Sequence, residues 1–183
     1  MRAYRDWSPV VALMFAVAFA PSARAASVTV SRNVGAEHVQ LHLLGAQPFF
    51  SQEDVAAKHI TEGMEIEGGA APVMPDAASH PNHSLIVQLL NRHTGKVMTR
   101  ARVVIKFGPN DDKGRPAGAL VEVPVVFTQA IGKGSSSTSY GNNVTMPAGH
   151  YRVLVTINND VPIHFNITAS DDPSMPMEHM KKM

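Results

Sequence analysis

Histidine and methionine are the residues of this chain whose chemistry stands out. The 183 residues include nine His, ten Met and no Cys, and every His lies C-terminal to residue 25. Imidazole and thioether ligands without thiolates suit copper, especially Cu(I), in an oxidising compartment where free Cys would be lost to disulfides. The composition therefore predicts binding of a transition metal.

The first candidate metal site is the stretch from Met74 to His83, MPDAASHPNH. His80 and His83 form a His-x-x-His pair that can direct both imidazoles at one ion if the intervening Pro bends the chain. Met74, and Met64 further upstream, would add thioether ligands. The alternative is a polar loop whose His side chains cap backbone groups, and the spacing alone leaves both interpretations open.

The second candidate site is the C-terminal stretch MPMEHMKKM, which ends the chain at Met183. A flexible segment of this composition can gather soft ligands around an ion, and the candidate ligands are Met175, Met177, His179 and Met180. The alternative is a disordered polar terminus, and the residues from Asp171 onward have no strand pattern.

Other residues offer weaker chemistry. His38 and His42 would share a strand face, but exposed His residues are common and a surface role is favoured. The chain contains no nucleophile elbow, phosphate-binding loop or zinc-protease helix, so the sequence predicts a protein that is not an enzyme.

The N-terminus has the three-part layout of a secretory leader. A basic start, an apolar run from Val10 to Ala20 and the small residues Ala23 and Ala25 predict cleavage after residue 25. The apolar run is too short to cross a bilayer as a helix. We therefore expect a periplasmic protein that is not inserted in the membrane, and its near-neutral charge argues against nucleic acid as a partner.

The remaining elements are mostly strands. Apolar residues alternate in two short strands between Ser27 and Leu44, and Ser51 with the acidic residues after it predicts a short helix to about Ile60. Met64 to Ile66 is a candidate edge strand. Further strands are expected over 83–90, 100–107, 120–128, 144–146, 151–157 and 161–167, with a hairpin turn over 91–96.

This pattern predicts an all-β fold, an antiparallel two-sheet sandwich of the immunoglobulin-like kind with a short N-terminal helix. The stretch from Pro147 to Tyr151 resembles the corner of such domains where a Tyr hydroxyl bonds back to the backbone. The expected organisation is a leader over 1–25, an N-terminal extension with strand and helix over 26–62, the sandwich over 63–169, and a flexible Met/His-rich tail over 170–183.

The middle of the chain, residues 63–167, also resembles a known family. The residues that carry the likeness are Gly63-Met64-Glu65-Ile66, His83 at the start of a strand, Asn91 to Gly95, Tyr140 to Asn143, and Gly149-His150-Tyr151. In this order and spacing they are similar to the periplasmic accessory proteins of ferrous-iron permeases. The resemblance implies an immunoglobulin-like dimer that binds copper and takes part in iron uptake, with a membrane metal permease or another periplasmic protein as partner.

Three departures from the family pattern bear on the metal site. Leu85 stands where the family has a carboxylate two residues after the His, and Ser139 stands where the family has a His before Tyr-Gly. The strand at 121–125 lacks the family's Met. Only His83 transfers, so His80, Met64 or Met74 would have to replace the lost ligands.

The sequence therefore predicts a non-catalytic periplasmic protein that binds or delivers copper or iron through His80 and His83 with Met64 or Met74, the tail acting as a capture arm. The alternative is a metal-free interaction module, in which an exposed sheet edge or the loop 132–139 contacts another protein.

Overall fold

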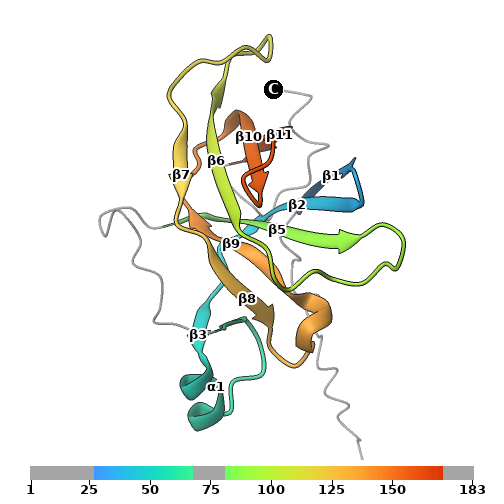
Figure 1. Cartoon of the computed structure of the whole chain (residues 1–183). Coiled ribbons are helices and arrows are strands. Elements are labelled where there is room, and N and C mark those ends of the chain that lie inside the picture. The colour runs from blue at the N-terminus through green and yellow to red at the C-terminus, as the bar shows by residue number, and fades with distance from the viewer. Residues whose placement is uncertain (1–26, 68–80, 171–183) are drawn as a thin grey trace, which may run out of the picture.

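The computed structural model describes residues 27–67 and 81–170, and they form two packed β-sheets (Figure 1). The larger sheet has seven strands in the order β1-β2-β5-β9-β8-β4-β3, and the smaller has four in the order β11-β10-β6-β7. The strands of the larger sheet are β1 (Val28–Val34), β2 (Glu37–Gly45), β3 (Phe49–Ser51), β4 (Met64–Ile66), β5 (His83–Asn91), β8 (Val126–Ala130) and β9 (Ser139–Val144). Those of the smaller sheet are β6 (Val103–Asn110), β7 (Val121–Val123), β10 (Gly149–Ile157) and β11 (Ile163–Ala169). The prediction of an all-β sandwich is confirmed.

Alternation of apolar and polar residues builds the core. In β2 the side chains of Val39, Leu41 and Leu43 are buried and enter the same apolar cluster as Leu85, Val87 and Leu89 of β5. The smaller sheet contributes residues of β10 and β11 to that cluster. Because side chains point to opposite faces in turn, each strand presents one apolar face to the other sheet. Residues 37–45, which precede the range expected for the sandwich, thus supply one of its central strands.

A helix follows β3 at the lower end of the molecule in Figure 1. Helix α1 (Gln52–Lys58) begins after Ser51, whose hydroxyl accepts a hydrogen bond from the backbone N–H of Asp54 at 3.0 Å. It ends at His59, which adopts a left-handed conformation. The helix connects β3 to β4, and these two strands pair in parallel whereas the other strand pairs are antiparallel. β3, not β4, is the strand at this edge of the sheet, so the expected edge position of Met64 to Ile66 is wrong.

The expected single strand over 120–128 is divided at Pro124. Residues 121–123 form β7 at the edge of the smaller sheet, and residues 126–130 form β8 inside the larger one. Proline has no N–H to give to a ladder, so the chain leaves one sheet here and joins the other. The side-chain amide of Asn142 donates to the Pro124 carbonyl at 2.8 Å and holds this crossing in place.

The turn over 91–96 is not a full hairpin. The Asn91 side chain accepts hydrogen bonds from the N–H groups of His93 and Thr94, each at 3.0 Å, and Gly95 has a positive φ. Beyond one bridge, Leu90 to Val97, the chain departs and β6 pairs with β10 and β7 instead of β5. The hydrogen bonds of the turn reverse the direction of the chain, but the next strand, β6, belongs to the smaller sheet.

The corner before β10 has the expected contact. The Tyr151 hydroxyl donates a hydrogen bond to the Pro147 carbonyl oxygen at 2.9 Å, while the Tyr151 ring is buried and tilted against Phe107. The Tyr side chain thereby ties the chain before β10 to the strand itself.

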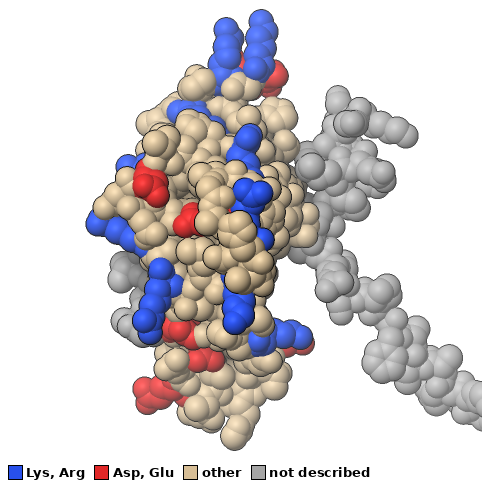
Figure 2. All heavy atoms as spheres, turned by 45° about the vertical axis from the view of Figure 1, so that its right-hand side comes forward, with Lys and Arg blue, Asp and Glu red and all other residues tan. Residues whose placement is uncertain are grey.

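Charge is mixed over the surface. Figure 2 shows Lys and Arg side chains spaced apart along the visible face, with Asp and Glu side chains between them. In the described part of the chain no helix is long and apolar enough to span a membrane. The expected leader over 1–25 and the tail residues 171–183 lie outside the described residues.

Candidate functional site

His83 and Met64 are the members of the first predicted site that lie in the described part of the chain, and His83 is the more informative of the two. It opens β5, pairs with Val144 of β9 and Gly45 of β2, and exposes 2% of its surface. Because Leu85 and Leu89 lie on alternate positions of the same strand and are fully buried, the His83 ring faces the core side of the sheet. The imidazole is therefore held at the end of the apolar core.

At the end of the sheet where His83 lies, two Asn side chains form pairs of hydrogen bonds like those between strands. Asn82 donates to the Met146 carbonyl at 3.0 Å and accepts from the Met146 N–H at 2.9 Å. Asn143 makes the same pair of bonds with Gln47, accepting from its N–H at 3.1 Å and donating to its carbonyl at 2.7 Å. Amide side chains can imitate a backbone pair in this way because they carry one acceptor and one donor group. These bonds hold the segment before His83 and the neighbouring strand β9 in place.

Met146 is a further candidate ligand, which no metal-ligand spacing pattern in the sequence indicated. Its side chain is fully buried in the core cluster, and its backbone is bound to Asn82, the residue before His83. Both an imidazole and a thioether are thus anchored at the same end of the sheet. The sequence offered one signal, a Met two positions beyond the buried Val144, but 63 residues separate Met146 from His83.

Met64 does not join His83. It is a buried residue of β4, where it pairs with Ala130 of β8 and with Phe49 of β3. Strands β8 and β9 lie between β4 and β5, which places Met64 about 14 Å or more from β5 at the usual strand spacing. Two side chains so far apart cannot share one ion, so Met64 is corrected from ligand to core residue.

The other predicted ligands, His80, Met74, Met175, Met177, His179 and Met180, lie outside the described residues. Within residues 27–67 and 81–170, no group of three or more His, Cys, Asp or Glu is arranged to hold a metal. A complete site at His83 would thus need ligands from residues 68–80, from the tail or from thioethers such as Met146.

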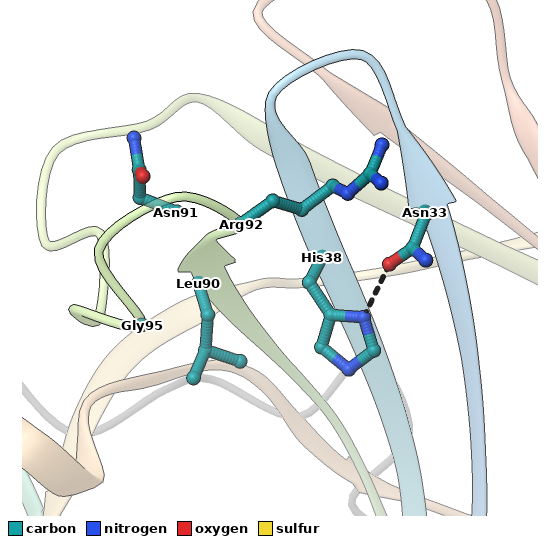
Figure 3. Close-up of a pocket in the computed structure, with 6 residues that line it drawn as sticks. All are labelled: Asn33, His38, Leu90, Asn91, Arg92 and Gly95. Carbon is teal, nitrogen blue, oxygen red and sulfur yellow. Dashed lines mark hydrogen bonds between the residues drawn. The ribbon is translucent and has the colours of Figure 1, made fainter.

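His38 lines a separate hollow on the outer face of the larger sheet (Figure 3). The hollow has a volume of about 290 Å3 and is lined by Asn33, His38, Leu90, Asn91, Arg92 and Gly95. In Figure 3 the His38 ring lies beside the Leu90 side chain and points toward Asn33. The Arg92 side chain extends toward the turn that joins β1 and β2. The Arg92 guanidinium donates to the Gly35 carbonyl at 3.1 Å, so Arg92 ties two turns together.

Both ring nitrogens of His38 have partners. Nδ1 lies 2.6 Å from the Asn33 side-chain oxygen, and Nε2 lies 3.2 Å from the Gln40 amide nitrogen. The Asn33 oxygen is an acceptor and the Gln40 amide nitrogen is a donor, so the ring is held from both sides. His38 thus acts as a bridge between β1 and β2.

His42 has a similar position four residues further along β2. Its Nδ1 lies 2.9 Å from the Thr29 hydroxyl of β1, and burial lowers the pKa of its imidazole. Four residues of extended strand separate the two His residues by about 13 Å, too far for one shared ion. The pair joins β1 to β2 and does not form a metal site.

No protein-family model, curated protein sequence or solved structure matches this chain.

Proposed function

We propose that this protein is a periplasmic, immunoglobulin-like β-sandwich that binds copper or iron without catalysing a reaction. The fold assignment is supported by the strand order. The central strands β2-β5-β9-β8 of one sheet and β11-β10-β6 of the other follow the order A-B-E-D and G-F-C of immunoglobulin domains. The bond from Tyr151 to Pro147 corresponds to the tyrosine corner of that fold.

The metal proposal is carried by the position of His83. A buried imidazole sits at the end of the core, directly after the sequence segment that holds Met74 and His80, and the side chain of the preceding residue, Asn82, is bonded to the Met146 backbone. Ligands brought up to such a position would be shielded from water, which favours soft ligands around Cu(I). His83 is the anchor, His80 and Met74 complete the set, and the tail residues act as a capture arm. The mixed surface charge suits a protein partner such as a membrane permease better than nucleic acid.

Titration of the full chain with Cu(I) and with Fe(II) tests this function. The variants are His80→Ala with His83→Ala, a chain ending at Ser170, and a control with His93→Ala and His164→Ala. Urea unfolding of each variant shows whether it is folded, because removal of buried His83 can lower stability. Loss of stoichiometric binding in the first variant alone supports the folded site, and loss only on truncation moves the site to the tail. Absence of binding by the unmodified chain would overturn the metal function.

A second candidate function is favoured by one observation, the length of the open edge at β1. A metal-free module would use such an edge to pair with another chain. The loop 132–139 is less available for this, because the Gln88 amide donates to the Ser136 carbonyl at 3.1 Å and Ser137 bonds to the Ala130 N–H at 3.0 Å.

A further inference from the structure

Among residues 27–67 and 81–170, β1 is a long strand that pairs with another strand on one side only. It is the outermost strand of the larger sheet, and Figure 1 shows it at the periphery of the sandwich next to β2. β1 and β11, which is an edge of the smaller sheet, have seven residues each, whereas the edges β3 and β7 have three each. A strand with one unpaired side presents backbone N–H and C=O groups that another strand can bind.

The hairpin geometry identifies those groups. β1 and β2 are joined by a two-residue turn at Gly35 and Ala36, and Val34 pairs with Glu37. Residues flanking such a turn form a hydrogen-bonded pair, so alternate residues of β1 bond to β2. Thr29, Ser31 and Asn33 therefore direct their backbone groups to the open side.

The edge carries one of the usual protective features, an inward-facing charge at Arg32, but no Pro, Lys or bulge. Natural proteins blunt edge strands with Pro, Lys, inward-pointing charges or bulges. β1 has the sequence VTVSRNV and pairs with β2 in one unbroken register. Its single charged side chain, Arg32, has its guanidinium carbon 6.0 Å from the centre of the Phe165 ring. This stacking holds the charge against the protein's own smaller sheet.

We infer that β1 pairs with β1 of a second copy of this chain, antiparallel and symmetric about Ser31. This register develops the interaction-module function and is independent of metal binding. It places Thr29 opposite Asn33 of the copy and Ser31 opposite its equivalent, so that the outward backbone groups of all three residues meet partners. Arg32 then lies opposite Val30, and no two like charges are directly opposed.

The same register matches an exposed side chain with a hollow. Val34 is 43% exposed, and the pairing sets it opposite Val28 of the copy, on the inward face of the strand. Val28 and Val30 line a hollow of about 310 Å3 between β1 and the smaller sheet, together with Ile167 of β11. Val34 of each copy would enter the hollow of the other. Burial of this apolar side chain gives the contact a favourable term beyond its hydrogen bonds.

Substitutions that place a charge at position 31 test the inference. They are made in the full chain, expressed with its natural N-terminal sequence. Ser31 is exposed and its backbone groups do not bond to β2, so the variants should fold. We expect the unmodified protein to show twice the single-chain mass in light scattering at submillimolar concentration. Ser31→Lys and Ser31→Glu should each show the single-chain mass, because like charges meet at the symmetry axis. An equimolar mixture of the two should return to the doubled mass.

Two matched controls make the result specific to β1. The chain has no Cys, so Ser31→Cys should cross-link two copies on oxidation, whereas Ser135→Cys, at an exposed position of the 3-10 helix Gly134–Ser137, should not. Val34→Asp should weaken the dimer at least tenfold, and Val161→Asp, at a Val that is 83% exposed on another turn, should not. A single-chain mass for the unmodified protein, or a dimer that survives both charge variants, would overturn the inference. Neither result would alter the outcome of the metal titration.

Discussion

The hydroxyl of Tyr151 lies 2.9 Å from the carbonyl oxygen of Pro147, and the two residues are four positions apart. Removal of that hydroxyl in Tyr151→Phe should lower the free energy of unfolding by about 1 kcal/mol, the usual value of one hydrogen bond. The ring stays, so its packing against Phe107 is preserved. Urea unfolding measures the change, and an unchanged unfolding midpoint would show that the corner does not depend on this bond.

Gly141 should tolerate no side chain. A Cβ at this position would overlap the Leu85 carbonyl oxygen and the Ile86 Cα of the neighbouring strand β5, which are backbone atoms that cannot move aside. We expect Gly141→Ala to cost about 3 kcal/mol of stability, as overpacking of a rigid core does. Gly132→Ala is the control, because its Cβ meets open space and the positive φ alone costs about 1 kcal/mol. Equal losses in the two variants would contradict the close approach of β5 and β9.

His42 should make stability depend on pH. Burial lowers the pKa of its imidazole in the folded state, so below about pH 6.5 the unfolded chain takes up a proton that the folded chain does not. The free energy of unfolding should therefore fall as the pH decreases from about 6.5, and level off below the folded-state pKa. His42→Gln keeps a polar group facing Thr29 and removes this titration.

The measurement is urea unfolding of both proteins at neutral and at mildly acidic pH. The unmodified protein should lose more stability than the His42→Gln variant between the two conditions. If both lose the same amount, His42 titrates alike in the folded and unfolded states.

The leader predicted from the sequence has its own test. Secretion from a bacterial host should yield a protein whose first residue is Ala26, as read by intact mass and N-terminal sequencing. Replacement of Ala25 by Arg should block processing, because the cleavage site requires a small residue, and Ala26→Ser should leave it intact. Recovery of the unprocessed chain from cells that export other secreted proteins would contradict the prediction.

Much of the fold followed from local sequence. Alternation located most strands and their buried faces, as in Val39, Leu41 and Leu43, because each residue of a strand points opposite to its neighbours. The strand expected over 144–146 was wrong, because the structure has it over 139–144. Ser51 located the start of α1 because its hydroxyl can accept from a helix N–H that lacks an internal partner. The stretch from Pro147 to Tyr151 located the corner, because its bond spans only four residues.

The allocation of strands to sheets was decided by tertiary structure. The segments on either side of the 91–96 turn entered different sheets, and the run through Pro124 divided between both, since long-range packing and not the turn itself selects the partner of a strand. β3 and β4 paired in parallel because α1 carries the chain back to the same side.

The candidate site, too, was predicted in part from the sequence and decided in part by the tertiary structure. The sequence alone shows the residue types and the spacing of His80 and His83. It also predicts that imidazole and thioether groups would suit a soft metal. Only the assembled sheets removed Met64 from the site, brought Met146 to Asn82 from 64 positions away, and left β1 at an open edge. Local patterns report the chemistry that a chain carries, whereas the contacts between distant strands determine which of those groups can meet.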